Sequence, residues 1–84
     1  MRRDTDSVAD IVIAARRAIH YVGNMSRSEF EDDELTSSAV IRQLGIVGEA
    51  ASRLSEEFRA SHAAFPWRKI VGMRNILIHA YNRV

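Results

Sequence analysis

The chain has 84 residues, no cysteine and a formal net charge of +1. This length allows one small domain, and the lack of cysteine excludes disulfides and thiolate metal sites as ways to stabilise it. No apolar run approaches the roughly 20 residues of a membrane span, and the N-terminus lacks the apolar core of a signal peptide. We therefore expect a cytoplasmic protein that gains stability by associating with another chain.

The charges are unevenly distributed along the sequence. Five acids fall within residues 29–34, whereas no acid follows Glu57 and the remaining charged residues are all basic: Arg59, Arg68, Lys69, Arg74 and Arg83. A basic segment of this kind favours a polyanion such as RNA. On charge alone, a solvated basic face explains the segment equally well.

The first third of the sequence predicts a helix over residues 5–22. Its apolar residues recur at spacings of three and four and form one stripe: Val8, Ile11, Val12, Ala15, Ile19 and Val22. Gly23 is expected to end this helix. Ser26 and Glu29 then have the spacing of a capping box, which predicts a short acidic helical turn over residues 26–32.

The middle of the sequence predicts a second long helix. Six apolar residues alternate at spacings of four and three over about five turns: Val40, Leu44, Val47, Ala51, Leu54 and Phe58. Gly45 and Gly48 lie inside this seam. Because glycine costs helix stability, we expect another backbone to approach closely there.

The last helix is expected over residues 66–82, after a linker at 60–65. Pro66 suits the first turn of a helix, where its missing N–H does no harm. Three main helices and one short acidic turn, joined by short connections, predict an all-α antiparallel helical bundle formed by a single domain, residues 1–84.

Arg74 stands out in this last helix. On a helical wheel it falls at the centre of an apolar arc formed by Trp67, Ile70, Val71, Leu77, Ile78 and Tyr81. An arginine in such an arc requires a paired charge or a ligand, and its planar donors suit a phosphate or a carboxylate. A buried ion pair with Glu49 is the competing explanation, and a kink at Gly72 would instead turn Arg74 outward.

His79 lies about 140° around the same helix from Arg74 and shares the polar side with Asn75. A lone surface histidine is the competing explanation, as it is for His20 near a helix end and His62 in a loop. The Arg74 and His79 side chains would converge across a two-fold axis, where the arginine of one subunit faces the histidine of the other. We therefore expect a homodimer.

Arginine and histidine together are sufficient to cleave RNA without a metal. Histidine exchanges protons near neutral pH, arginine neutralises charge on the phosphorane, and RNA supplies the 2′-OH nucleophile. The sequence has no His/Cys spacing or carboxylate cluster typical of a metal site and no glycine-rich phosphate loop. We expect neither a metal nor a cofactor.

Three segments resemble HEPN-domain toxins of the HepT type. Residues 74–81, RNILIHAY, resemble the R-x4-H-x-Y signature of that family, with a polar residue, Asn75, in second position. Residues 45–54, GIVGEAASRL, and 66–75, PWRKIVGMRN, resemble two further family stretches in the same order. The resemblance extends over nearly the whole chain.

This resemblance implies an α-helical homodimer with a composite cleft between two R-x4-H motifs, and ribonuclease activity that includes tRNA. It also implies a type VII toxin–antitoxin pair, in which an MntA-like nucleotidyltransferase antitoxin transfers AMP from ATP to the tyrosine of H-x-Y. Arg74 and His79 would be catalytic, Asn75 a supporting polar residue and Tyr81 the AMPylated residue. A core or interface aromatic is the alternative for Tyr81.

One departure from the family leaves other functions open. HepT-type proteins continue after H-x-Y with another helix, whereas this sequence stops at Val84, so the domain is expected to be C-terminally short. The first alternative is a non-catalytic HEPN dimer that binds a nucleotidyltransferase partner or RNA. The second is a HEPN module that binds a nucleotide.

Overall fold

The chain folds as an antiparallel helical bundle. The computed structural model describes residues 3–73, 75 and 79, and no strand occurs among them. Five helices follow in chain order: α1 (Asp4–Val22), α2 (Arg27–Asp32), α3 (Glu34–Ser52), α4 (Glu56–Ser61) and α5 (Trp67–Val71). The predicted all-α class is confirmed.

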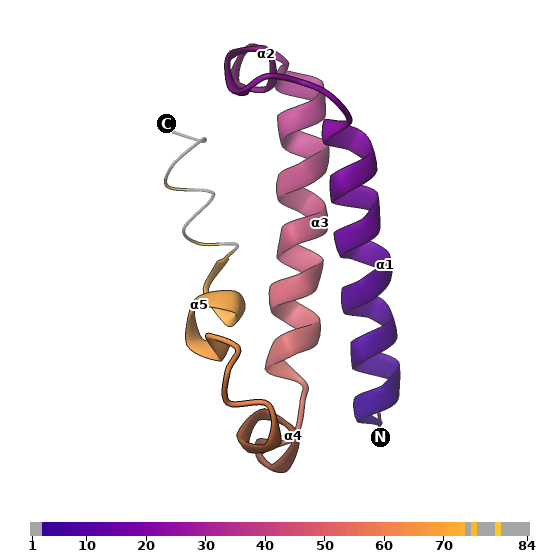
Figure 1. Ribbon diagram of the computed structural model, residues 1–84, viewed down its shortest axis with the longest axis vertical. Coiled ribbons are helices and arrows are strands. Elements are labelled where there is room, and N and C mark those ends of the chain that lie inside the picture. Colours follow the sequence, from indigo (N-terminus) through magenta and orange to yellow (C-terminus); the bar gives the residue numbers. More distant parts are fainter. Residues whose placement is uncertain (1–2, 74, 76–78, 80–84) are drawn as a thin grey trace.

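The central helix of the bundle is α3. The long helices α1 and α3 run side by side in opposite directions, and α5 lies on the other side of α3 (Figure 1). The short helix α2 covers one end of this arrangement and α4 the other. The turn between α4 and α5 therefore reverses the chain and brings α5 alongside α3.

Local capping explains the bounds of α1. At its start, the Arg3 backbone N–H donates to Asp6 Oδ2 at 3.3 Å. At its end, Gly23 adopts a φ of 53° and its N–H donates to the Ile19 carbonyl at 3.0 Å. Glycine adopts this backbone region without a Cβ penalty, so the predicted end of the first helix is confirmed.

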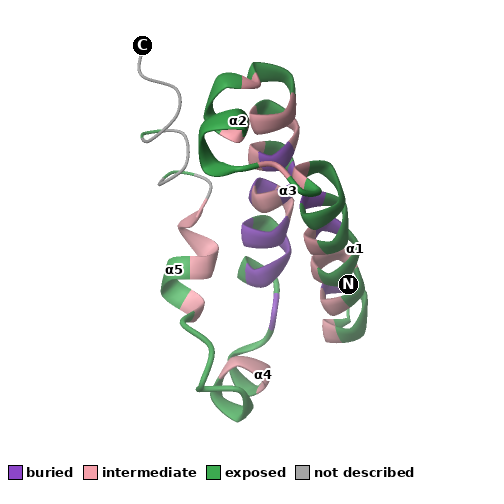
Figure 2. Cartoon of the chain, turned by 45° about the horizontal axis from the view of Figure 1, so that its top comes forward, coloured by how far each residue is buried: buried purple, intermediate pink, exposed green. Residues whose placement is uncertain are grey.

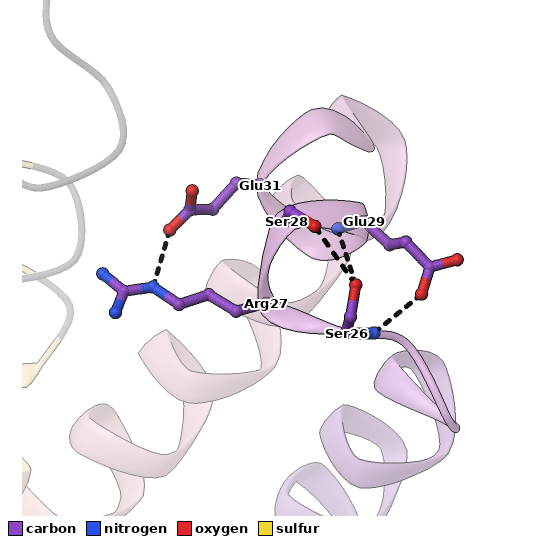
Figure 3. A network of polar contacts seen from close by, with 5 residues as sticks. All are labelled: Ser26, Arg27, Ser28, Glu29 and Glu31. Atoms are coloured by element: carbon purple, nitrogen blue, oxygen red, sulfur yellow. Dashed lines mark hydrogen bonds and ion pairs between the residues drawn. The ribbon is translucent and has the colours of Figure 1, made fainter.

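The predicted acidic turn is present as α2. The Ser26 hydroxyl accepts from the Glu29 backbone N–H at 3.2 Å, and the Glu29 carboxylate accepts from the Ser26 backbone N–H at 2.9 Å (Figure 3). These reciprocal bonds form the capping box that the sequence predicts. One turn further on, Arg27 and Glu31 form an exposed ion pair at 2.9 Å.

The buried residues of α1 are all small, whereas those of α3 are mixed in size; both helices carry purple, buried stretches in Figure 2. On α1 they are Ser7, Ala14 and Ala18, and on α3 they include Val40, Gln43 and Val47 beside Ala50 and Ala51. Small residues allow two helix backbones to approach closely. The apolar stripe predicted for the first helix is therefore only partly buried, because Val12 and Ile19 remain 40% and 72% exposed.

The prediction of one helix through Phe58 is wrong. Helix α3 ends at Ser52, and a new helix begins at Glu56. The break occurs because Ser55 caps α4, where its hydroxyl accepts from the Phe58 backbone N–H at 3.1 Å. Leu54 is nevertheless buried, with 2% exposure, so the apolar seam predicted the core positions but not the path of the chain.

Three further boundaries differ from the sequence prediction. Helix α4 extends to Ser61, into the expected linker, and Pro66 is the N-cap of α5 rather than its first helical residue. Helix α5 ends at Val71, Gly72 is a turn residue, and Met73 is helical again. The expected continuous helix over residues 66–82 is therefore interrupted at Gly72. This is the glycine at which the sequence analysis considers a kink.

The chain exposes more surface than a compact monomer of its mass. Its accessible surface is 6505 Å², whereas a folded monomer of 9.5 kDa exposes about 5,000 Å². Among the residues that the structure describes, the buried apolar ones are Val40, Val47, Leu54 and four alanines. Alanine side chains contribute little hydrophobic stabilisation each.

Candidate functional site

The candidate site lies in the segment that begins with α5. The structure describes residues 67–73, 75 and 79 of this segment. A close backbone contact fixes its position on the bundle. A Cβ placed on Gly48 of α3 would lie 3.0 Å from the Ile70 carbonyl oxygen and 3.1 Å from that of Val71. The close approach predicted at Gly48 is thus confirmed, and α5 is the element that makes it.

Trp67 fixes the start of α5. Its indole Nε1–H lies 3.1 Å from the Arg59 carbonyl and 3.0 Å from the His62 carbonyl, and it donates to both. These two carbonyls belong to the last turn and the C-cap of α4, and each also accepts a backbone N–H: that of Arg59 from His62 at 3.2 Å, and that of His62 from Phe65 at 3.1 Å. The tryptophan therefore joins the end of α4 to the beginning of α5.

Asn75 and His79 are the two predicted site residues that the structure describes. Both are helical and exposed. Both side chains are therefore accessible, while residues 74 and 76–78 between and beside them lie outside the described part of the chain.

Arg74 and Tyr81 lie outside the described residues. The expected contact between Arg74 and His79 therefore lies outside them as well. The alternative partner for Arg74, Glu49, forms an exposed ion pair with Arg53 at 3.2 Å. Among the described residues, no group of three His, Cys, Asp or Glu side chains is placed to hold a metal ion.

The two other histidines occupy the kinds of position that the sequence predicts. His20 is exposed in the last turn of α1, where its ring lies 6.3 Å from that of Tyr21. His62 is the C-cap of α4 and stacks on Phe58 with ring centroids 4.2 Å apart. His62 Nδ1 also lies 2.9 Å from the Phe58 carbonyl.

An apolar cavity of about 460 Å³ opens between α1, α3, α4 and α5. Val8 and Ile11 of α1 form one wall, and Ile70 and Met73 form the opposite wall next to the candidate site. Aromatic side chains line one end of the cavity: Phe58, His62, Phe65 and Trp67. The sequence analysis overlooked this aromatic group, although its close spacing was visible between residues 58 and 67.

Comparison with known proteins identifies the family. A family described as "Ribonuclease HepT-like" matches residues 11–84. The chain belongs to this HepT-like family. Its relatives include "Putative RNase MJ1380" of Methanocaldococcus jannaschii, 39% identical over 72 residues, which cover 86% of this chain and 66% of that protein.

Two further HepT-like relatives come from other organisms. "Putative RNase TTE0752" of Caldanaerobacter subterraneus is 43% identical over 63 residues, which cover 75% of this chain and 56% of that protein. "Probable ribonuclease HepT" of Thermococcus cleftensis is 36% identical over 80 residues, which cover 95% and 73% of the two chains. The match to each relative thus spans only part of that relative's length. No solved structure matches the chain.

The comparisons confirm the HepT-type resemblance inferred from the sequence. No helix among the described residues is long and apolar enough to cross a membrane.

Proposed function

We propose that the chain is a ribonuclease of the HepT type that cleaves RNA without a metal. Membership of the HepT-like family carries this proposal. The exposure of His79 and Asn75 supports it, because a catalytic histidine must reach its substrate.

The proposed chemistry uses the 2′-OH of the RNA as the nucleophile. His79 accepts the 2′-OH proton or donates a proton to the departing 5′-oxygen, since imidazole serves either role near neutral pH. The 2′-oxygen bonds to phosphorus as the bond to the 5′-oxygen breaks. Arg74 stabilises the negative charge on the phosphorane, and Asn75 supports the phosphate contact. The products are a 2′,3′-cyclic phosphate and a 5′-OH.

We further propose that the active cleft forms between two copies of the chain. Two observations support association: the accessible surface of 6505 Å² is large for the mass, and the buried core among the described residues is small. Pairing about a two-fold axis would bring Arg74 of one subunit towards the partner's His79. A particle of monomeric mass at micromolar concentration in light scattering would contradict this shared cleft.

In the cell, the proposed role is that of a cytoplasmic toxin whose substrate is RNA, including tRNA. An MntA-like nucleotidyltransferase antitoxin would neutralise it by transferring AMP to Tyr81. The added phosphate would repel RNA beside the cleft by like charge.

Cleavage of a synthetic RNA in the presence of EDTA tests the ribonuclease proposal. The wild type is expected to release fragments with cyclic phosphate ends, and His79→Ala to lose this activity. His20→Ala is the matched control, because His20 is also an exposed helical histidine but lies on α1. Activity retained by His79→Ala, or abolished by EDTA, would refute the proposal.

A non-catalytic HEPN dimer is the second candidate function. This function predicts binding of RNA or of the nucleotidyltransferase without turnover. Calorimetric titration with ATP and AMP separates both candidates from a nucleotide-binding HEPN module.

A further inference from the structure

Four aromatic rings gather where α4 turns into α5. His62 stacks on Phe58 at 4.2 Å with an angle of 21° between the ring planes, and Phe58 meets Trp67 edge-on at 6.2 Å. Phe65 lies 5.4 Å from Trp67 at 39°. These four side chains, which we term the aromatic corner, line one end of the apolar cavity.

The polar atoms of the aromatic corner are largely used within the protein. The Trp67 indole N–H already donates to two carbonyls, and His62 Nδ1 lies within bonding distance of the Phe58 carbonyl. The corner therefore has ring faces, rather than hydrogen-bonding edges, to offer a ligand. Phe65 is accessible to such a ligand, with 55% of its surface exposed.

The charges of the aromatic corner are basic on the side of α5. Arg68 and Lys69, directly after Trp67, are both exposed, whereas the acids Glu56 and Glu57 lie in the first turn of α4, before Phe58. A patch that combines ring faces with positive charge suits a ligand that is flat and apolar at one end and anionic at the other. Unstacked nucleotides of a single strand have this chemistry, with bases that stack on aromatic rings and phosphates that attract Arg and Lys.

We infer that the aromatic corner binds an unpaired base of the RNA substrate by stacking on Phe65, with Arg68 and Lys69 attracting the adjacent phosphates. The inference rests on the proposed function, because that function makes RNA the substrate. The cavity of about 460 Å³ gives the base room to enter beside Phe65 and Trp67. Only single-stranded or locally opened RNA presents such a base.

The position of the corner connects it to the candidate catalytic segment. Trp67 and Asn75 are only eight residues apart in the sequence, which corresponds to about 12 Å of rise where the chain is helical. A strand held at the corner would therefore extend towards Asn75 and His79. In this arrangement the corner selects a nucleotide near the cleaved bond and does not take part in the chemistry.

Trp67 is the only tryptophan of the chain and provides the test. Its fluorescence is followed while a short single-stranded RNA is titrated into the His79→Ala variant, which prevents cleavage during the measurement. The same RNA with one base removed, and the matching duplex, are titrated in parallel. We expect the intact single strand to quench the Trp67 fluorescence strongly. The strand with one base removed and the duplex should bind more weakly.

Phe65 variants make the test specific. We expect Phe65→Ala to bind the single strand about tenfold more weakly, as for the loss of one base–aromatic stack, and Phe65→Tyr to bind like the parent. Leu35→Ala is the matched control, because Leu35 is a large apolar residue 82% exposed on α3, far along the sequence from the corner. Unchanged affinity in Phe65→Ala, equal loss in Leu35→Ala, or equal binding of duplex and single strand would overturn the inference.

Cleavage measurements separate this inference from the proposed function. If Phe65→Ala binds and cleaves single-stranded RNA like the wild type, the stacking site is refuted while the ribonuclease stands. If the wild type does not cleave but binds single strands in a base-dependent way, the ribonuclease is refuted while the stacking site stands.

Discussion

Asp4 and Ser55, 51 residues apart in the sequence, form a double hydrogen bond across the bundle. The Ser55 backbone N–H donates to Asp4 Oδ1 at 2.9 Å, and the Ser55 hydroxyl donates to Asp4 Oδ2 at 2.7 Å. The same hydroxyl accepts from the Phe58 N–H and caps α4. One carboxylate at the start of α1 thus fixes the point where the chain leaves α3 and begins α4.

The first prediction concerns acid stability. The hydrogen bond from the Ser55 hydroxyl, followed by that from its backbone N–H, holds the pKa of Asp4 below its ordinary value. A lowered folded-state pKa contributes stability above the unfolded-state value, about 3.9, and that contribution is lost as the pH falls through the folded-state pKa. Asp4→Asn should therefore flatten the pH dependence of the free energy of unfolding around pH 4 and below.

Urea unfolding monitored by circular dichroism at several pH values measures this effect. The partner variant Ser55→Ala should cost about 1 kcal/mol through the lost helix cap. In the Ser55→Ala background, Asp4→Asn should have a smaller effect than in the wild type, because part of the contact is already gone. Fully additive effects would show that Asp4 and Ser55 are not coupled.

The second prediction concerns Gly48. Alanine normally stabilises a helix interior by roughly 1 kcal/mol relative to glycine, but a Cβ here would press on the carbonyls of Ile70 and Val71. Both atoms belong to backbone, so α5 must move as a unit. We expect Gly48→Ala to lower the free energy of unfolding by about 1 kcal/mol, since overpacking outweighs helix propensity. It should also reduce RNA cleavage.

Ser38→Ala is the control for Gly48→Ala. Ser38 lies on the same helix and is exposed, so the added propensity acts there without a new contact. We expect a small gain in stability and full activity from this control. If Gly48→Ala raised the free energy of unfolding as much as Ser38→Ala does, this would show that α5 can move away from residue 48 without losing stability.

The third prediction concerns the capping box of α2. Ser26→Ala removes the hydroxyl that accepts from the Glu29 N–H and should destabilise α2 by about 1 kcal/mol. Hydrogen exchange of the α2 amides is the suitable measurement, because a short terminal helix opens locally. Ser28→Ala, which removes a neighbouring exposed hydroxyl, should have a much smaller effect.

The fourth prediction concerns regulation at Tyr81. If Tyr81 accepts AMP, incubation of the chain with ATP and an MntA-like nucleotidyltransferase should add AMP to the wild type and not to Tyr81→Phe. Intact-mass spectrometry detects the addition. The matched control is Tyr21→Phe, since Tyr21 is an exposed tyrosine on α1. Modification of Tyr81→Phe, or its loss in Tyr21→Phe, would rule out Tyr81 as the acceptor.

The sequence predicted helix ends well wherever a local signal specified them. Gly23 ends α1 and the Ser26–Glu29 pair begins α2, both as expected. Each of these features depends on the conformation or size of one residue and its near neighbours. Such features can be derived from sequence because few long-range contacts influence them.

The break between α3 and α4 could not be predicted in this way. The apolar seam continues through Leu54 and Phe58, but Ser55 is drawn out of the helix by Asp4, a residue 51 positions away. The buried face of α1 was also missed, because burial at Ser7, Ala14 and Ala18 follows from how closely α3 approaches. Periodicity predicts an apolar face and says nothing about the distance between two backbones.

At the candidate site, the sequence predicted the polar face that carries Asn75 and His79, and the structure confirms that both are exposed. The roles of Arg74, His79, Asn75 and Tyr81 remain predictions. The aromatic corner escaped notice because its rings come from α4, the following turn and α5. A helical wheel drawn for one predicted helix does not bring them together.

The small buried side chains of α1 have a consequence for the abundance of the protein. The residues that α1 buries are one serine and two alanines, which remove little apolar area from water. Any partner that binds only the folded chain raises its folded population by mass action. The amount of protein that escapes proteolysis in the cell should therefore follow the supply of its binding partners as much as its rate of synthesis.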